Sequence, residues 1–448
     1  MKSRTIHVCT SCGSSSMRWQ GQCPGCGEWN TLESRSISQD RKITTDTPSC
    51  RPSRLSQVDL SRADYISTGM QELDEVLGGG LVPGGVVLLG GEPGIGKSTL
   101  LLQLLCFAGS RKGHALYVSG EESLPQIRSR AQRLGLDQEN IQALATGSLE
   151  DILAAMDENV PYEIMIIDSV QTISSRESES IAGAPTQVRL VSSSLVKAAK
   201  KAGTCIFLVG HVTKEGQIAG PKLLEHMVDT VIYLEGDKEH LFRILRVIKN
   251  RYGPTDELVM FQMGALGLEV IQDPSTFFLQ ARDPALSGTA VVMAVDGHKP
   301  FAVEVQALAT PSFLSIPRRT ALGFDLNRLH LLLAVMEKKL QRSLAQSDIY
   351  TKIGGGLKLV DPGLDLGLVA AVLSSFHNQS LPERAVFWGE VDLNGQIRPV
   401  LGQDIRLKQA LRLGYKPVFC PRSPDSDTGI STIMELQELL FGSNNPGS

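Results

Sequence analysis

Residues 91–98 carry the pattern of a loop that binds phosphate groups. The run Gly91-Glu92-Pro93-Gly94-Ile95-Gly96-Lys97-Ser98 fits G-x4-G-K-[ST], and it lies between the apolar segment 86–90 and a helix predicted from Lys97 to Gly109. Glycines let backbone N–H groups converge on phosphate oxygens, and the helix adds the positive end of its dipole. Lys97 should reach the β- and γ-phosphates, and the Ser98 hydroxyl should bind Mg²⁺. The sequence therefore predicts an ATP and Mg²⁺ site that extends to Thr99. An ordinary glycine-rich turn is the alternative.

Three carboxylates follow apolar segments downstream of this loop. Asp168 ends the segment 163–168 and is the expected second partner of Mg²⁺, although a strand-end aspartate is often only a turn residue. Glu121 and Glu122 follow the segment 115–119. In ATPases of the RecA type, which this arrangement resembles, a carboxylate at that point polarises the attacking water. We assign this role to Glu121, and the alternative for both glutamates is a place at a helix N-terminus.

Four cysteines near the N-terminus have the spacing of a metal site. Two C-x2-C pairs are separated by ten residues and consist of Cys9, Cys12, Cys23 and Cys26. Four thiolates complete the tetrahedral coordination of Zn²⁺ and leave no open position, so the predicted zinc is structural. Four unrelated thiols and a redox pair are the alternatives.

Composition and element order indicate the architecture. The 448 residues are 42% hydrophobic and 21% charged with a net charge of −4, which is ordinary for a globular protein and excludes a global basic field. Short apolar runs alternate with helical segments from about Ile66, which predicts an α/β fold with a parallel sheet. No apolar run is long enough for a membrane span, and the cysteine usage favours the cytoplasm. The predicted parts are a zinc knuckle at 1–33, a linker at 34–62, an ATPase domain at 63–272 and a second α/β domain at 273–448.

Basic residues gather in two places outside the phosphate loop. Lys249 and Arg251 lie in the run KNRYG (249–253) at a predicted strand end, and alternate strand positions point to the same side. They could reach the γ-phosphate of a neighbouring subunit, pair with DNA phosphates, or simply face solvent. Lys214 and Lys222 lie in a glycine-rich segment that could contact DNA phosphates or be a surface loop.

Several segments together resemble one family. SGEES (119–123), IIDSVQT (166–172), the segment 210–231 and KNRYG are similar to the bacterial RadA (Sms) family of DNA-repair ATPases, with Tyr252 where phenylalanine is commoner. The resemblance covers nearly the whole chain. It implies a RecA-like core, DNA-stimulated ATP hydrolysis, single-stranded and branched DNA as partners, a RecA-type recombinase as a further partner, and a hexameric ring that drives branch migration. It also favours a nucleotide-facing or DNA-facing role for Lys249 and Arg251.

The last part of the chain resembles the peptidase domain of Lon. The similar segments are 361–375 and 387–415, and the positions of Lon's catalytic serine and lysine fall on Gly363 and Asp404. Glycine offers no nucleophile and aspartate cannot act as a neutral amine base. We therefore expect a scaffold for ring assembly without peptidase activity.

These expectations lead to one main function and two alternatives. The main hypothesis is a DNA-dependent ATPase motor for recombination, with Lys97, Glu121, Lys249 and Arg251 as its catalytic residues. An ATP-dependent peptidase is the first alternative. A nucleotide-switched binding module without translocation is the second.

Overall fold

The computed structural model of the chain contains two compact units, Met1–Leu60 and Ser61–Ser448. The structure describes residues 4–9, 15–16, 18–24, 27–37, 65–109, 114–136, 141–157, 162–210, 221–236, 242–255, 257–279, 283–422 and 429–442. Most of the predicted linker, residues 38–62, lies outside the described residues. Within the described part, no helix is both long and apolar enough to cross a membrane.

The first unit has a small antiparallel sheet. Its strand order is β2-β1-β3, and its strands are β1 (Arg4–Cys9), β2 (Ser15–Ser16) and β3 (Leu32–Ile37). β1 pairs with β3 from Arg4 opposite Ile37 to Cys9 opposite Leu32. The sheet thus continues four residues beyond the predicted end of the knuckle at residue 33, because β3 runs to Ile37. The division of the chain into four predicted parts otherwise stays a prediction.

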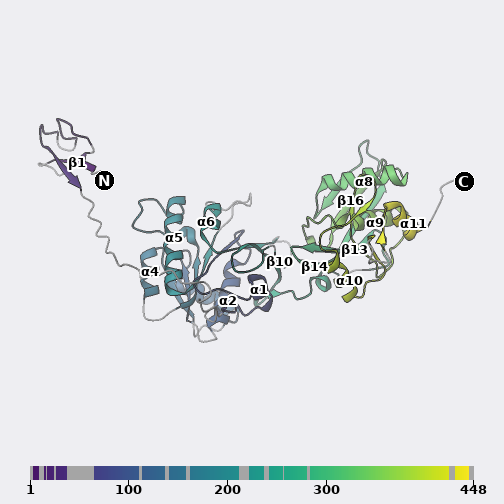
Figure 1. Cartoon of the computed structure of the whole chain (residues 1–448), viewed down its shortest axis with the longest axis horizontal. Helices are drawn as coiled ribbons and strands as arrows, with labels where there is room; N and C mark the ends of the chain where they lie inside the picture. The colour runs from purple at the N-terminus through teal and green to yellow at the C-terminus, as the bar shows by residue number, and fades with distance from the viewer. Residues whose placement is uncertain are drawn as a thin grey trace, which may run out of the picture. The chain divides into compact units, whose positions relative to one another are not determined.

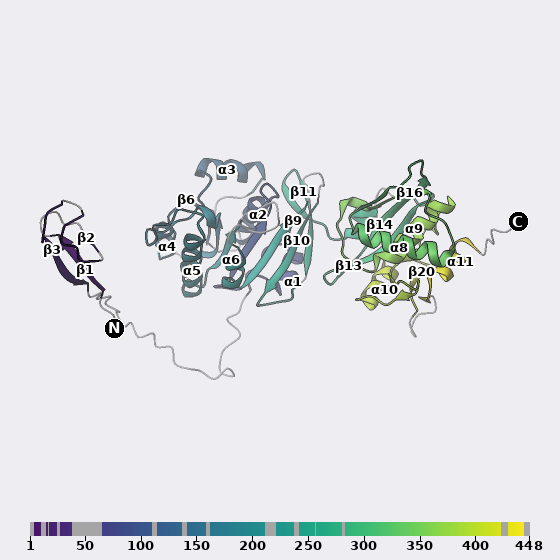
Figure 2. The same ribbon diagram turned by 90° about the horizontal axis from the view of Figure 1, so that it is seen from above.

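A nine-stranded sheet forms the first part of the second unit (Figures 1 and 2). Its order is β12-β11-β10-β9-β4-β8-β7-β5-β6, in which the strands from β9 to β6 are parallel and β10, β11 and β12 are antiparallel additions. The strands are β4 (Val86–Gly91), β5 (His114–Ser119), β6 (Ile141–Ala145), β7 (Tyr162–Asp168), β8 (Cys205–Val209), β9 (Thr230–Glu235), β10 (Phe242–Asn250), β11 (Leu258–Gly264) and β12 (Gly267–Val270). The central strands β4, β7 and β8 are almost entirely buried, as parallel strands covered on both faces must be.

Helices cover both faces of this sheet. They are α1 (Gln71–Leu77), α2 (Lys97–Gly109), α3 (Leu124–Arg133), α4 (Leu149–Asp157), α5 (Pro185–Ala202) and α6 (Pro221–Met227). One apolar cluster joins α1, α2 and α3 to one face, and a second joins α4, α5 and α6 to the other. The predicted α/β fold with a core of parallel strands is confirmed.

A second sheet forms the C-terminal part. Its seven strands have the order β15-β16-β14-β13-β17-β20-β21. Their bounds are β13 (Thr289–Asp296), β14 (Lys299–Pro311), β15 (Arg319–Leu322), β16 (Ser347–Ile353), β17 (Val386–Phe387), β20 (Val418–Pro421) and β21 (Gly429–Ile430). The helices are α7 (Pro274–Leu279), α8 (Leu326–Leu340), α9 (Leu364–His377), α10 (Gln403–Arg412) and α11 (Ile433–Phe441). A hairpin turns at Asn394-Gly395, between β18 (Glu390–Val391) and β19 (Ile397–Arg398).

The two sheets share apolar contacts and one ion pair. Phe242 and Ile244 of β10 belong to the same buried cluster as residues of β13 and β14. Arg246, also in β10, donates two hydrogen bonds to Asp296, at 2.7 and 2.9 Å. Strand β10 therefore belongs to the first sheet and also anchors the second.

The position expected for a Lon-type serine is closed by a buried ion pair. Arg406 donates to both carboxylate oxygens of Asp361, at 2.8 and 2.9 Å, and both side chains are at most 5% exposed. A Cβ atom added at Gly363 would lie 2.7 Å from Nη1 of Arg406. Asp404 is exposed on α10. The Ser374 hydroxyl on α9 is buried: it accepts a hydrogen bond from the N–H of Gly288 and donates one to the carbonyl oxygen of Gln379.

Replacing Arg406 by Met should be strongly destabilising. The change leaves the Asp361 carboxylate buried without its ion-pair partner, and such a loss costs about 3–5 kcal/mol in the free energy of unfolding. Urea unfolding of the full chain measures it. The control is Arg398→Met, which removes an exposed pair with Asp392 and should cost about 0–1 kcal/mol. Equal effects would contradict a structural role for the Arg406 pair.

Candidate nucleotide and metal sites

The glycine-rich loop connects β4 to α2 in a conformation that needs glycine. Gly91 has φ +152° and Gly94 has φ +79°. A Cβ at Gly91 would lie 2.5 Å from the carbonyl oxygen of Leu234, whereas no atom lies within 4 Å of a Cβ built on Gly94. Gly91 is therefore needed for close packing on β9, and Gly94 for its left-handed backbone.

Lys97 begins α2 and folds back onto the loop. Its Nζ donates to the carbonyl oxygens of Gly91, at 2.8 Å, and Glu92, at 3.0 Å, and the residue is only 4% exposed. Burial lowers the pKa of Lys97, and the nearby charges of Asp168 and Glu121 partly oppose this shift. The ammonium group is thus held inside the loop, next to two carboxylates.

Asp168 is the polar centre of the strand ends next to the loop. Its Oδ2 accepts a hydrogen bond from the Ser98 hydroxyl at 2.6 Å and another from the Tyr117 hydroxyl at 2.5 Å. Burial and the Asp168 charge raise the pKa of Tyr117, so this phenol stays a donor. A hydroxyl beside a carboxylate is an oxygen set that suits Mg²⁺. The sequence prediction missed Tyr117, although its polar hydroxyl in an apolar strand was a visible signal.

The structure separates the two neighbouring glutamates. Oε1 of Glu121 accepts a hydrogen bond from the Ser169 hydroxyl at 2.7 Å, and Ser169 directly follows Asp168. Glu122 instead forms an ion pair with Arg130 of α3. Strands β5 and β7 are adjacent with Ser119 opposite Asp168, so Glu121 is brought to the same strand edge as Ser98 and Asp168.

The cations of KNRYG lie away from the phosphate loop, toward the other end of the strands. Lys249 of β10 lies opposite Val231 of β9, and Val231 lies opposite Leu88 of β4. Leu88 comes three residues before Gly91, where the phosphate loop begins. At a strand rise of about 3.3 Å per residue, that offset is roughly 10 Å along the sheet. Neither Lys249 nor Arg251 is placed at the phosphate loop of its own chain.

Both cations contact the end of α6 or the residues between α6 and β9. Lys249 donates to the carbonyl oxygens of Glu225, at 2.6 Å, and Val228, at 2.8 Å. Arg251 pairs with Asp229 at 3.0 Å while its side chain stays 54% exposed. Burial and the neighbouring Arg251 lower the pKa of Lys249. The two side chains therefore bind to the C-terminal end of α6 and to the two residues that follow it.

The rest of the motif is structural. Asn250 donates to the carbonyl oxygen of Leu77 at the end of α1, at 3.1 Å. A Cβ at Gly253 would lie 2.7 Å from Cα of Gly78. Of the two lysines predicted to contact DNA, Lys214 lies outside the described residues, and Lys222 lies in α6, where its side chain is not described.

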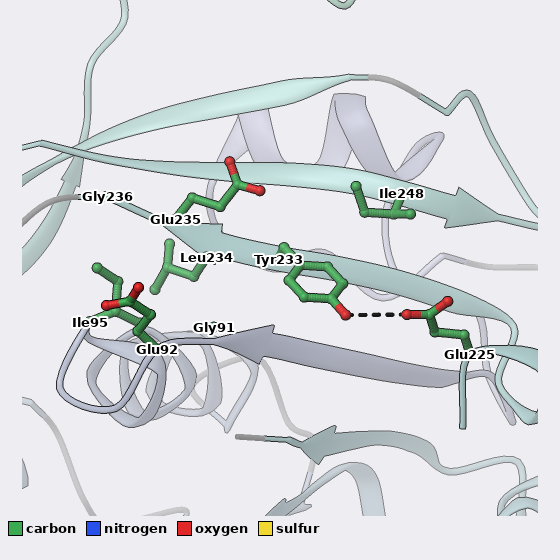
Figure 3. A pocket seen from close by; sticks show the side chains of 9 residues that line it. All are labelled: Gly91, Glu92, Ile95, Glu225, Tyr233, Leu234, Glu235, Gly236 and Ile248. Carbon is green, nitrogen blue, oxygen red and sulfur yellow. Dashed lines mark hydrogen bonds between the residues drawn. The ribbon is translucent and has the colours of Figure 1, made fainter. Parts of the chain in front are cut away.

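A cavity of about 380 Å³ lies between the phosphate loop and strands β9 and β10 (Figure 3). The carboxylates of Glu92, Glu225 and Glu235 are on its lining, and the Tyr233 hydroxyl donates to Glu225 at 3.2 Å. Burial, with Glu225 nearby, raises the pKa of Tyr233. The cavity was not predicted from the sequence, because its lining comes from four elements that are separated along the chain: the phosphate loop, α6, β9 and β10.

Two of the four predicted zinc ligands are brought together. Cys9 and Cys23 are each 2% exposed and form one buried cluster. Cys12 and Cys26 lie outside the described residues. Two buried sulfur atoms packed together fit a thiolate metal site.

Comparison with known proteins agrees with these two sites. Residues 50–217 match the family model of an AAA domain, and residues 7–34 match that of a rubredoxin metal binding domain. The DNA repair protein RadA of Halalkalibacterium halodurans is 42% identical over 98% of this chain and 99% of its own length. The protein of the same name in Rickettsia bellii is 43% identical over 99% of this chain and 100% of its own length. The one in Bacillus subtilis is 42% identical over 94% of this chain and 93% of its own length. The solved KaiC-like protein PH0186 of Pyrococcus horikoshii aligns with 47% of this chain and 99% of its own, at 20% identity and a TM-score of 0.40.

Purified protein should contain about one zinc ion per chain, because four thiolates complete one site. Cys9→Ser should lose most of this metal, as measured by elemental analysis and by release to a chromogenic chelator. Cys205→Ala is the control, since Cys205 is a buried thiol of β8 in the other unit. Full metal content in the Cys9 variant would rule out this ligand assignment.

Proposed function

Because the chain belongs to the family of DNA repair protein RadA, we propose that it is a DNA-dependent ATPase that acts in recombinational repair. We propose that it processes recombination intermediates and promotes branch migration in the cytoplasm as a ring-shaped motor on single-stranded DNA. The observation that best supports hydrolysis is the group of Ser98, Asp168 and Glu121 at one strand edge beside Lys97.

Each residue of this group has a distinct proposed role. Lys97 would leave its two loop carbonyls and neutralise the β- and γ-phosphates of ATP. Ser98 and Asp168 would hold Mg²⁺, which neutralises phosphate charge when it is bound, and Tyr117 keeps the Asp168 carboxylate oriented. Glu121, oriented by Ser169, would take the proton of the attacking water.

The cations of KNRYG are proposed to act on a neighbouring chain. A head-to-tail arrangement brings one edge of a subunit to a different edge of the next, and it closes into a ring when the rotation allows. Lys249 and Arg251 could then approach the γ-phosphate held by the neighbour, in a homo-hexamer. Their distance from the phosphate loop of their own chain supports this trans role.

DNA contacts and further partners complete the proposal. Lys214 and Lys222 would contact the phosphates of single-stranded or branched DNA, which positions a strand without reading its sequence. A RecA-type recombinase is the proposed protein partner, and structural zinc would hold the N-terminal unit. The C-terminal part would act as a Lon-like scaffold, and the space taken by Arg406 beside Gly363 argues against the peptidase alternative.

Single-stranded DNA should raise the ATPase rate of the full chain several-fold at fixed protein concentration. The physical reason is that a motor must link phosphate-loop chemistry to strand contact. Lys97→Ala is the control and should hydrolyse no ATP with or without DNA. A wild-type rate that DNA does not change would favour the nucleotide-switched module instead.

Glu121→Gln should lower kcat by at least about 10²-fold, because amide nitrogen and oxygen cannot accept the proton of water. Nucleotide binding, measured by fluorescence of a labelled ADP, should persist. Glu122→Gln is the matched control: it loses the ion pair with Arg130 and should keep most of its turnover. The reverse pattern, with Glu122→Gln inactive and Glu121→Gln active, would exchange the two assignments.

A further inference from the structure

One buried arginine outside all the recognised motifs contacts the phosphate loop. Arg243 is the second residue of β10 and is 7% exposed. Its Nε donates to the carbonyl oxygen of Ile95 at 3.1 Å, and its Nη1 donates to the carbonyl oxygen of Phe242 at 2.8 Å. Ile95 lies between Gly94 and Gly96 in the middle of the loop. A side chain from an antiparallel strand thus holds the loop's backbone.

The surrounding residues leave a slot for this side chain. A Cβ at Gly236 would lie 2.7 Å from Cδ of Arg243 and 3.0 Å from the carbonyl oxygen of Phe242. Ile95, on the other side, is 1% exposed. Gly236 and Ile95 both line the cavity beside the loop, where Figure 3 places them at the same end. Glycine at 236 is therefore required for the arginine to reach Ile95.

The strand that carries Arg243 is fixed from its other face. Successive strand residues point to opposite faces. Phe242 packs edge-on against Phe278 of α7 with ring centroids 5.4 Å apart, and Phe278 lies 6.3 Å from Phe301 of β14. This aromatic contact anchors the start of β10, so the guanidinium group is presented to the loop from a rigid base.

The hydrogen bond to Ile95 determines where the next N–H group points. A peptide unit is planar and trans, so its C=O and N–H point in opposite directions. The carbonyl of Ile95 and the N–H of Gly96 belong to one such unit. When Arg243 holds the carbonyl of Ile95 toward β10, the N–H of Gly96 is directed away from β10. This N–H group is thereby oriented in advance as a donor to a phosphate oxygen.

We propose that Arg243 is a positioning residue for nucleotide binding, which fixes the Ile95–Gly96 peptide. The group does not touch the reacting atoms, so it should affect ground-state affinity more than the chemical step. This inference rests on the proposed nucleotide-binding function. Arg243 would thus contribute to nucleotide affinity through its contact with Ile95, although it lies about 150 residues beyond the loop in the sequence.

The test is nucleotide affinity in Arg243→Met, measured on the full chain with a fluorescent ADP analogue and by ATPase kinetics. A hydrogen bond donated by a charged group is among the stronger ones in a protein, and losing it changes an affinity by about tenfold or more. We therefore expect Kd and KM to rise about tenfold or more, with a much smaller change in kcat. Arg243→Lys, which keeps the charge, should recover part of the affinity.

Two further variants make the result specific. Gly236→Ala keeps the arginine but adds a methyl group against its Cδ, so Kd should rise as it does in Arg243→Met. This second variant keeps the inference testable if Arg243→Met folds poorly. Arg246→Met is the matched control on the same strand: it loses its bonds to Asp296 and should lower the Tm without changing Kd. Unchanged Kd in folded Arg243→Met or Gly236→Ala, or an equal rise in Arg246→Met, would overturn the inference. Failure of the wild-type chain to bind ADP would instead refute the proposed function.

Discussion

The separation between the two ends of the strands in one sheet is the constraint on which the proposed mechanism depends. The parallel strands β4, β5 and β7 bring Lys97, Glu121 and Asp168 to their C-terminal ends. The antiparallel strand β10 carries its last residues toward the N-terminal ends of the same strands. Strands within a hydrogen-bonded sheet cannot slide past one another without losing their register. Within one subunit, Lys249 and Arg251 are therefore held at the end of α6 and not at the phosphate loop.

Strand β10 connects the parts of the chain that the proposed cycle needs. Its first residues hold the loop at Ile95 and share an apolar cluster with the C-terminal sheet. Its last residues hold the end of α6, the helix that follows the segment proposed to contact DNA. The phosphate loop, the C-terminal part and the end of α6 thus all contact one strand. A strand with contacts at both ends offers a direct physical route for linking these sites.

The sequence predicted the fold class, the loop and its flanking elements because each of these depends on local pattern. Residues 86–91 are uniformly apolar, and the G-x4-G-K-S spacing fixes the turn that follows. Tyr117 and Arg243 were missed because their roles depend on strand pairing, which brings Tyr117 to Asp168 and Arg243 to Ile95. The choice between Glu121 and Glu122 likewise needed the positions of Ser169 and Arg130. The family model over residues 7–34 agrees with a metal site near the N-terminus. The four zinc ligands and the DNA-contacting lysines remain predictions.

The central claim is that each active site is completed by the next chain, and subunit mixing tests it most directly. Lys97→Ala lacks a working loop but has an intact KNRYG segment, and Arg251→Gln has the reverse. When the two inactive variants are mixed, about a quarter of head-to-tail interfaces join an intact loop to an intact cation. The account predicts that DNA-stimulated ATP hydrolysis returns on mixing. If mixing restored no activity although mixed rings had formed, the cations would act within their own chain, and the account would be wrong.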